Sequence, residues 1–170
     1  MNIKKLLKNA VLSVGVLSLM SASSYAGNFA CVDTQAVMQK STFAKSLGKS
    51  LNDRVAQIKK KLQSYESQLQ NLQKEIESKA LSKQAKKEKI KEYENLRLQA
   101  LEYQQDAQKE LQSMQEKAGK EFTEALKTAV TNYAKSHNLE AVFDCNQMLY
   151  TADSIDITNT IIKALDSSHK

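Results

Sequence analysis

Two long runs of apolar residues with the spacing of amphipathic helices constrain the fold of this chain more than any other feature. In the first run the apolar residues fall three or four positions apart, at Ala44, Leu47, Leu51, Val55, Ile58, Leu62, Tyr65, Leu69, Leu72 and Ile76. The second run has the same spacing, at Ile90, Tyr93, Leu96, Ala100, Tyr103, Ala107, Leu111, Met114, Ala118 and Phe122. Each run predicts a helix with one apolar face, which needs a partner to cover it.

The two runs predict helices that fold back on each other. If the chain reverses near Ser82 and Lys83, facing residue numbers add to 165 or 166 along the whole length of the pair. Small residues of the second run then fall opposite large ones of the first, as Ala107 does opposite Ile58, and close helix packing favours this combination. Residues 80–83 contain no Gly or Pro to force a turn, so one uninterrupted coiled-coil rod is the alternative.

The segments on either side of these runs predict a small body with strands. Residues 28–32 and 139–143 are short apolar runs typical of buried strands. Residues 148–150 predict a third strand, which pairs with the second as an antiparallel hairpin. A last helix is expected to begin at Asp156 or Thr158. So few strand residues cannot form a stable sheet alone, and we expect copies of the chain to complete a shared barrel or core.

The predicted fold class is α+β and predominantly α, because the chain has no Pro and only four Gly. Residues 44–137 form a long antiparallel helical hairpin, or tentacle, with its tip near 80–84. Residues 27–43 and 138–170 form a small body of the β-barrel type, in which oligomerisation takes place.

The first 26 residues have the pattern of a secretory signal peptide. Three lysines precede the apolar run 10–20, and Ser24, Tyr25 and Ala26 fit a small-residue cleavage site. The run is too short to span a membrane as a mature helix. Its removal takes away three lysines and no acid, so the formal net charge falls from +6 to +3. The sequence therefore predicts an exported, soluble mature chain.

Lysines cluster at the predicted tip of the hairpin. A solvated helix end is the simpler interpretation of such a charge run, and attraction of anionic partners is the functional one. Acidic protein segments, lipid head groups and lipopolysaccharide are such partners, whereas nucleic acid is not expected for an exported chain without a recognition element. The candidate binding residues are Lys79, Lys83, Lys86, Lys87, Lys89 and Lys91.

Cys31 and Cys145 lie far apart in the sequence, each in or beside a predicted strand. In an oxidising compartment such a pair can form one disulfide, which would tie the two ends of the body together across the base of the hairpin. Two buried free thiols that act as small apolar side chains are the alternative.

Gly48 and Gly119 fall nearly opposite each other near the base of the predicted hairpin, because their numbers add to 167. Gly inside a helix costs about 1 kcal/mol relative to Ala. One hypothesis is a paired weak point at which the tentacle flexes, and the other is close packing of the two backbones.

The sequence contains no pattern that predicts an enzyme. It has no G-x-S-x-G, no phosphate-binding loop and no H-E-x-x-H, and its only histidines are His137 and His169. We therefore expect no catalysis, no cofactor and no metal. A structural coiled-coil adaptor that scaffolds an envelope complex is the main rival to a binding function.

The ends of the chain resemble the Skp (OmpH) family of chaperones. The segment 29–33 followed by Val37, Met38 and Gln39 is similar to the family's first strand and short helix. Near the C-terminus, the motifs that carry the resemblance are Val142-Phe143-Asp144-Cys145-Asn146, then Tyr150, then Asp156-Ile157-Thr158. The tentacle matches the family in length and heptad character only.

The resemblance implies a periplasmic homotrimer whose strands form a small central barrel and whose three tentacles surround a cavity. Such a trimer holds unfolded outer membrane proteins without ATP, which makes it a holdase. The family is strongly basic, and this mature chain at +3 is less so. The lipopolysaccharide site proposed for the family consists of basic residues along the arms, and the tip lysines are candidates for it here. The residues expected in the trimer body are Phe29, Val32, Val142, Phe143, Tyr150 and Ile157.

Overall fold

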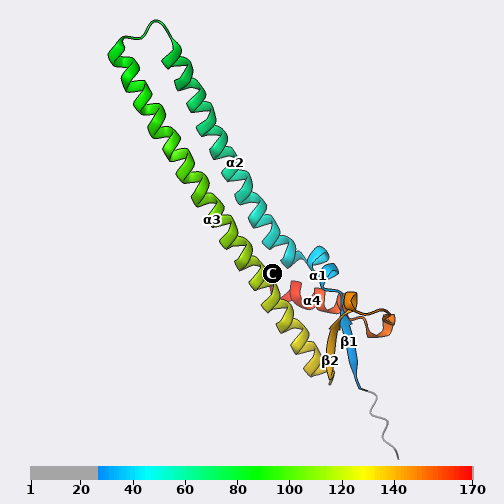
Figure 1. The fold of residues 1–170 in the computed structure, drawn as a ribbon. Helices are drawn as coiled ribbons and strands as arrows, with labels where there is room; N and C mark the ends of the chain where they lie inside the picture. The colour runs from blue at the N-terminus through cyan, green and yellow to red at the C-terminus, as the bar shows by residue number, and fades with distance from the viewer. Residues whose placement is uncertain (1–26, 170) are drawn as a thin grey trace, which may run out of the picture.

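The protein is a long pair of antiparallel helices with a small body at one end (Figure 1). The computed structural model describes residues 27–169, so the predicted signal peptide lies outside the described residues. The long helices are α2 (Thr42–Glu77) and α3 (Lys83–Ser136). The chain reverses between them, which confirms the predicted helical hairpin and the predominantly helical α+β class, and rules out the uninterrupted rod.

Serine side chains set the ends of the long helices. The Ser41 hydroxyl accepts a hydrogen bond from the Ala44 N–H at the start of α2, and the Ser82 hydroxyl accepts one from the Ala85 N–H at the start of α3. Each satisfies an amide that has no partner within the helix. Asn138 follows α3 with a φ of 53°, the left-handed conformation that closes a helix. The tip therefore turns without Gly or Pro because Ser82 supplies the cap.

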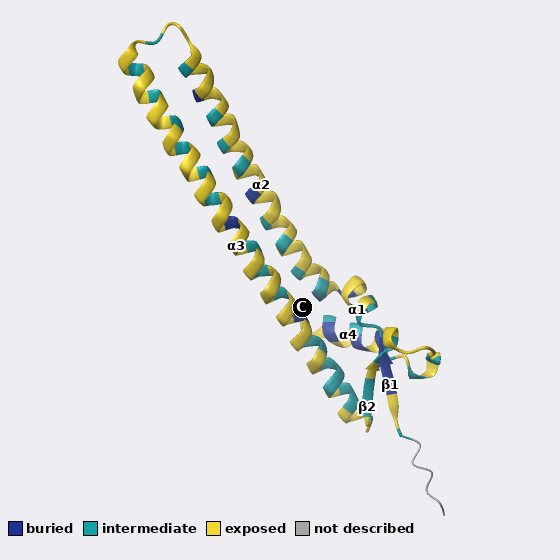
Figure 2. Ribbon diagram, in the orientation of Figure 1, coloured by how far each residue is buried: buried dark blue, intermediate teal, exposed yellow. Residues whose placement is uncertain are grey.

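The two helices pack along the predicted stripes. Ile58 and Ala107 are both buried halfway along, and their numbers add to 165 as predicted. Near the base Phe122 is buried together with Phe43, which lies one position before the predicted run. In Figure 2 the buried and intermediate positions recur along both arms of the hairpin, among exposed ones. The hairpin therefore has a narrow internal seam, and most of its remaining surface is exposed in the single chain.

Two residues predicted on the stripes turn outward. Val55 is 44% exposed and Ile90 is 39% exposed, whereas their neighbours Arg54 and Lys89 are half-buried at the seam. Arg54 forms an ion pair with Glu110, and Lys89 forms one with Glu75, in each case with the opposite helix. The long aliphatic stems of Arg and Lys can cover apolar surface while their charged ends pair, so apolar spacing alone misplaced the seam at these two turns.

The body combines two strands and two short helices. Strand β1 (Phe29–Val32) pairs with β2 (Ala141–Asp144) in parallel, and helices α1 (Thr34–Lys40) and α4 (Thr158–Ser168) pack beside them. Short 3₁₀ turns occur at η2 (Cys145–Gln147) and η3 (Asp153–Ile155).

The predicted antiparallel strand hairpin is wrong. The Asp144 carboxylate accepts a hydrogen bond from the Asn146 N–H and starts the 3₁₀ turn η2, so the chain leaves the sheet there. Residues 148–150 form no strand, and within the described residues the sheet is the pair β1–β2. The sheet in one chain is therefore not a closed barrel.

The core lies where the body meets the hairpin. Its buried members are Val32, Val37, Phe43, Phe122, Ile161 and Leu165. They come from β1, α1, the bases of α2 and α3, and α4. The packing is continuous across the proposed domain limits near residues 43 and 137, so the division into body and tentacle stays a prediction. Among residues 27–169, no helix is long and apolar enough to cross a membrane.

Candidate functional site

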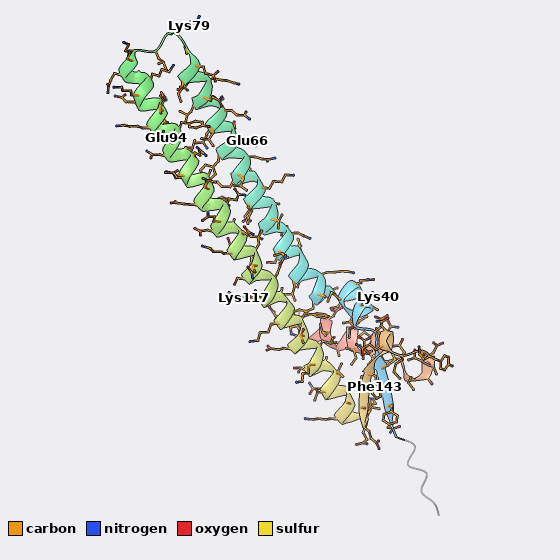
Figure 3. The ribbon with its side chains drawn as sticks, viewed as in Figure 1. Lys40, Glu66, Lys79, Glu94, Lys117 and Phe143 are labelled. Atoms are coloured by element: carbon orange, nitrogen blue, oxygen red, sulfur yellow. A yellow bond between two sulfur atoms is a disulfide. The ribbon has the colours of Figure 1, made fainter. Side chains whose placement is uncertain are left out.

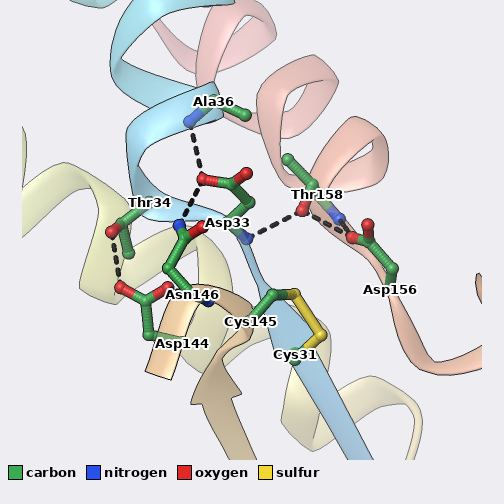
Figure 4. Close-up of a disulfide and its surroundings, with 9 residues drawn as sticks. All are labelled: Cys31, Asp33, Thr34, Ala36, Asp144, Cys145, Asn146, Asp156 and Thr158. Carbon is green, nitrogen blue, oxygen red and sulfur yellow. Dashed lines mark hydrogen bonds between the residues drawn. A yellow bond between two sulfur atoms is a disulfide. The ribbon is translucent and has the colours of Figure 1, made fainter. Parts of the chain in front are cut away.

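A disulfide and a set of hydrogen bonds join the two ends of the chain (Figure 4). Cys31 in β1 is fully buried and is bonded to Cys145 in η2, 114 residues later. Beside it the Asn146 side chain donates to the Asp33 carboxylate at 2.6 Å, and the Thr34 hydroxyl donates to Asp144 at 2.6 Å. The disulfide and both hydrogen bonds connect the same two segments of the body.

The two carboxylates of this network are held in their charged form. Hydrogen bonds from the Ala36 N–H and from the Asn146 side chain hold the pKa of Asp33 below its usual value. The hydrogen bond from the Thr34 hydroxyl does the same for the pKa of Asp144. These charges therefore support the body at neutral pH.

Asp166 fastens α4 to the start of the tentacle. Its carboxylate accepts hydrogen bonds from the Ser41 hydroxyl at 2.6 Å and from the Phe43 N–H at 3.2 Å. Burial alone would raise the pKa of Asp166, but the hydrogen bonds from Ser41, Phe43 and Thr42 lower it overall. The negative charge also lies at the N-terminus of α2, where the helix dipole favours it.

The body exposes a set of large apolar side chains, which we call the body patch. Its members come from both strands and from the segment after η2: Phe29, Phe143, Met148, Leu149 and Tyr150. The Phe29 and Phe143 rings lie 6.0 Å apart, and Phe143 is labelled in Figure 3. Leu149 and Tyr150 are 109% and 81% exposed, so the body of a single chain does not cover them.

The six residues predicted for the trimer body separate into two groups. Phe29, Phe143 and Tyr150 belong to the body patch. Val32 is buried, and Val142 and Ile157 pack against the core, so these three contribute to packing within the single chain. Their role in a trimer stays a prediction.

The predicted lysine cluster lies at the tip, where Figure 3 labels Lys79. Lys89 differs from the other five, because its ammonium lies 2.9 Å from Glu75 and 3.1 Å from Glu92, and these pairs raise its pKa. The remaining candidates are exposed: Lys79, Lys83, Lys86, Lys87 and Lys91.

The seam between the arms opens into grooves of different character on its two sides. A polar groove of about 610 Å³ near the tip is lined largely by amides and charged groups, among them Gln68, Asn71, Glu75, Glu92 and Asn95. An apolar groove of about 310 Å³ lies lower on the arms, and its apolar members are Leu62, Tyr65, Leu69, Tyr93, Ala100 and Leu101. Six of the eleven residues that line the second groove are apolar, against two of eleven in the first, so the two sides of the hairpin differ in composition.

Comparison with known proteins identifies the family. Residues 28–165 match the family described as outer membrane protein (OmpH-like). The chain belongs to the OmpH-like family. The match includes both strands, both arms and most of α4, and it confirms the resemblance at the chain ends.

This OmpH-like chain is similar to two further proteins. An uncharacterized protein of Aquifex aeolicus (strain VF5) is 36% identical over 151 residues, which cover 89% of this chain and 93% of that protein. A crystal structure of an OmpH-like protein from Caulobacter crescentus CB15, described as a candidate outer membrane chaperone, has a TM-score of 0.74 and 17% sequence identity. The likeness covers 84% of this chain and 85% of that one, and it shows a shared fold.

The glycines of this OmpH-like hairpin point away from the seam. Gly48 and Gly119 are both exposed, and a Cβ atom on either would meet no described atom within 4 Å. The hypothesis that they allow close packing of two backbones is therefore wrong. Flexing of the arms near these residues stays a prediction.

Two features of the OmpH-like site were missed in the sequence. Arg54 donates two hydrogen bonds to Glu110, from Nε at 2.8 Å and from Nη2 at 2.6 Å, and this two-point contact fixes the register of the arms near the base. The Asp166 contact was also missed. The opposite charges of Arg54 and Glu110 could have suggested the first contact, because their numbers add to 164, one below the sums of the facing stripe residues. Nothing local identifies Asp166 as the partner of Ser41.

Proposed function

We propose that this protein is a periplasmic holdase chaperone, which binds unfolded outer membrane proteins between the tentacles of a homotrimer and prevents their aggregation without ATP. Membership of the OmpH-like family and the shared fold with a candidate outer membrane chaperone support this proposal. The main observation behind it is that one chain combines a body with exposed large apolar side chains and two helical arms that extend far beyond that body (Figure 1).

The body patch supports the oligomer. Leu149 and Tyr150 lie exposed in the segment after η2. The sheet of this body has only two four-residue strands, and such a sheet is marginal on its own. Large apolar side chains exposed on a small body often mark an interaction site, and a free strand edge invites another chain. A closed cyclic assembly covers the same patch in every copy. Three bodies joined in this way would hold three tentacles around one space.

The tentacles supply the holding surface. Helix α2 has 36 residues and is about 54 Å long at ~1.5 Å per residue, so three such arms would give a client a long surface to contact. Many weak contacts acting at once retain a client without selecting one sequence or requiring fuel for release. The excess of positive charge draws acidic segments toward the arms, at a rate that falls with salt. The five exposed tip lysines add a contact to anionic lipid or lipopolysaccharide surfaces.

Two measurements test this function. The mass of the mature chain in solution should equal three subunits and should increase by one client when a urea-unfolded outer membrane β-barrel protein is added. In a light-scattering assay, one trimer per client should keep several unrelated unfolded barrel proteins soluble with no nucleotide present. A scaffolding adaptor would instead bind one folded partner and leave the unfolded proteins to aggregate, which would overturn the proposal.

A further inference from the structure

The two sides of the hairpin differ in a way that identifies where a client would bind. On one side, the inter-arm ion pairs Arg54–Glu110 and Lys89–Glu75 border grooves lined mainly by polar side chains. On the other side, the apolar groove contains leucines and tyrosines from both arms, together with Glu66, Arg97 and three glutamines. A chaperone that must contact apolar segments has this second side available.

Two outward-turned residues extend the apolar groove along the same side. Val55 precedes Leu62, a groove residue of α2, by seven positions, and Ile90 precedes Arg97, a groove residue of α3, by seven. Seven residues are close to two helical turns, so each outward residue lies on the groove side of its helix. With Leu101, which is 46% exposed in the groove, they form three separated apolar points.

The three points span the length of one membrane-crossing β-strand. Arg54 pairs with Glu110, which places Val55 beside Glu110 along the hairpin. From Ile90 to Glu110 is a rise of about 30 Å at ~1.5 Å per residue. An extended chain covers that distance in about nine residues at ~3.3 Å each, and a strand of an outer membrane barrel has about 9–11.

We propose that the apolar side of the tentacle, formed by Val55, the apolar groove and Ile90, binds one extended strand segment of an unfolded barrel protein, whose apolar side chains lie against the three points. This inference rests on the proposed holdase function and identifies the segment that the arm recognises. A helix from a second copy fits the surface less well, because it would require apolar residues every three to four positions, whereas Gln70, Gln73 and Gln104 interrupt this side. An extended segment with alternating apolar residues needs only spaced contacts.

Leu98 provides a matched control for this side. It lies nine residues, or two and a half turns, before the buried Ala107, and therefore on the opposite side of α3 from the seam. Leu98 is 58% exposed, more than Leu101, and it does not line the groove. The variants Leu98→Gln and Leu101→Gln thus make the same chemical change three residues apart.

The experiment measures affinity for an outer membrane β-barrel protein unfolded in urea and diluted into the chaperone. The chain has no Trp, so the client's Trp emission reports binding without background. Val55, Ile90 and Leu101 are exposed, so their replacement by Gln should leave the helical circular dichroism and the oligomer mass unchanged. The triple variant should raise the Kd about tenfold, Leu101→Gln alone about threefold, and Leu98→Gln less than about twofold.

The outcomes separate the inference from the function on which it rests. If the wild-type chain does not bind the client, the holdase function is refuted. If the wild-type chain binds and the triple variant binds equally well, or Leu98→Gln weakens binding as much as Leu101→Gln does, the assignment of the client to this side is wrong. A loss of oligomer mass in the triple variant without client would show that a second copy occupies the side, which also overturns the inference.

Discussion

The disulfide between Cys31 and Cys145 should contribute a large share of the stability of this protein. Replacing both cysteines by Ala removes a cross-link that closes a loop across 114 residues. The chain-entropy model assigns such a loop a stabilisation of about 5 kcal/mol at room temperature. Long helices that persist in the unfolded chain reduce the entropy gained on opening the loop, so we expect a loss of between about 2 and 5 kcal/mol.

Urea unfolding followed by far-ultraviolet circular dichroism measures this loss. Oxidised wild type and the double variant are compared at one subunit concentration, because oligomer stability depends on concentration. Wild type treated with reductant should unfold at the same urea concentration as the double variant, and the double variant should not respond to reductant. If oxidised wild type and the double variant had the same urea midpoint and the same dependence on urea concentration, the disulfide would contribute nothing and the reasoning would be refuted.

Three further predictions follow from the exposed glycines, the Asp166 contact and the body patch. Gly48→Ala and Gly119→Ala should each raise the free energy of unfolding in urea by about 1 kcal/mol, since a Cβ atom meets only open space at both positions. If the double variant also has the wild-type arm spread in X-ray scattering and the wild-type client capacity, flexing at the glycines is excluded. The folded-state pKa of Asp166 lies below its ordinary value of 3.8, so the contribution of its charge to folding stability is complete above that pH and is lost as the pH falls toward the folded-state value. The melting temperature of wild type should therefore fall on acidification below about pH 4, and that of Asp166→Asn should fall less steeply. Leu149→Asp with Tyr150→Asp should reduce the mass in sedimentation to that of one subunit while helical content is retained, and an unchanged mass would show that the body patch is not the oligomer interface.

The sequence predicts the hairpin well because its determinants are local. The spacing of Ile58 and its neighbours defines the helical face, and Ser82 supplies a cap that acts within three residues. The exceptions are the turns at Arg54 and Lys89, where a charged residue takes the seam position because it finds a partner on the other arm. Hydrophobic periodicity contains no information on that partner.

The body is harder to predict because its contacts are distant in the sequence. The pairing of β1 with β2 joins Cys31 to Phe143 in register, and nothing within either segment indicates a parallel partner so far away. Residues 148–150 have a strand-like composition, yet they are exposed and unpaired within the described chain. Apolar residues that pack in their own sheet and apolar residues that face another subunit give the same local pattern.

The unequal length of the two arms has a mechanical consequence. Helix α3 has 54 residues and α2 has 36, and the extra turns of α3 run down through the core as far as the sheet. One continuous rod therefore reaches from β2 to the tip, with about 60 Å between Phe122 and Lys83 at ~1.5 Å per residue. Rotating its base by roughly 5° displaces the tip by roughly 5 Å by the same geometry. Because the side chains around Phe122 lie at the foot of this stretch, even a small repacking there would move the tip of the hairpin relative to the body.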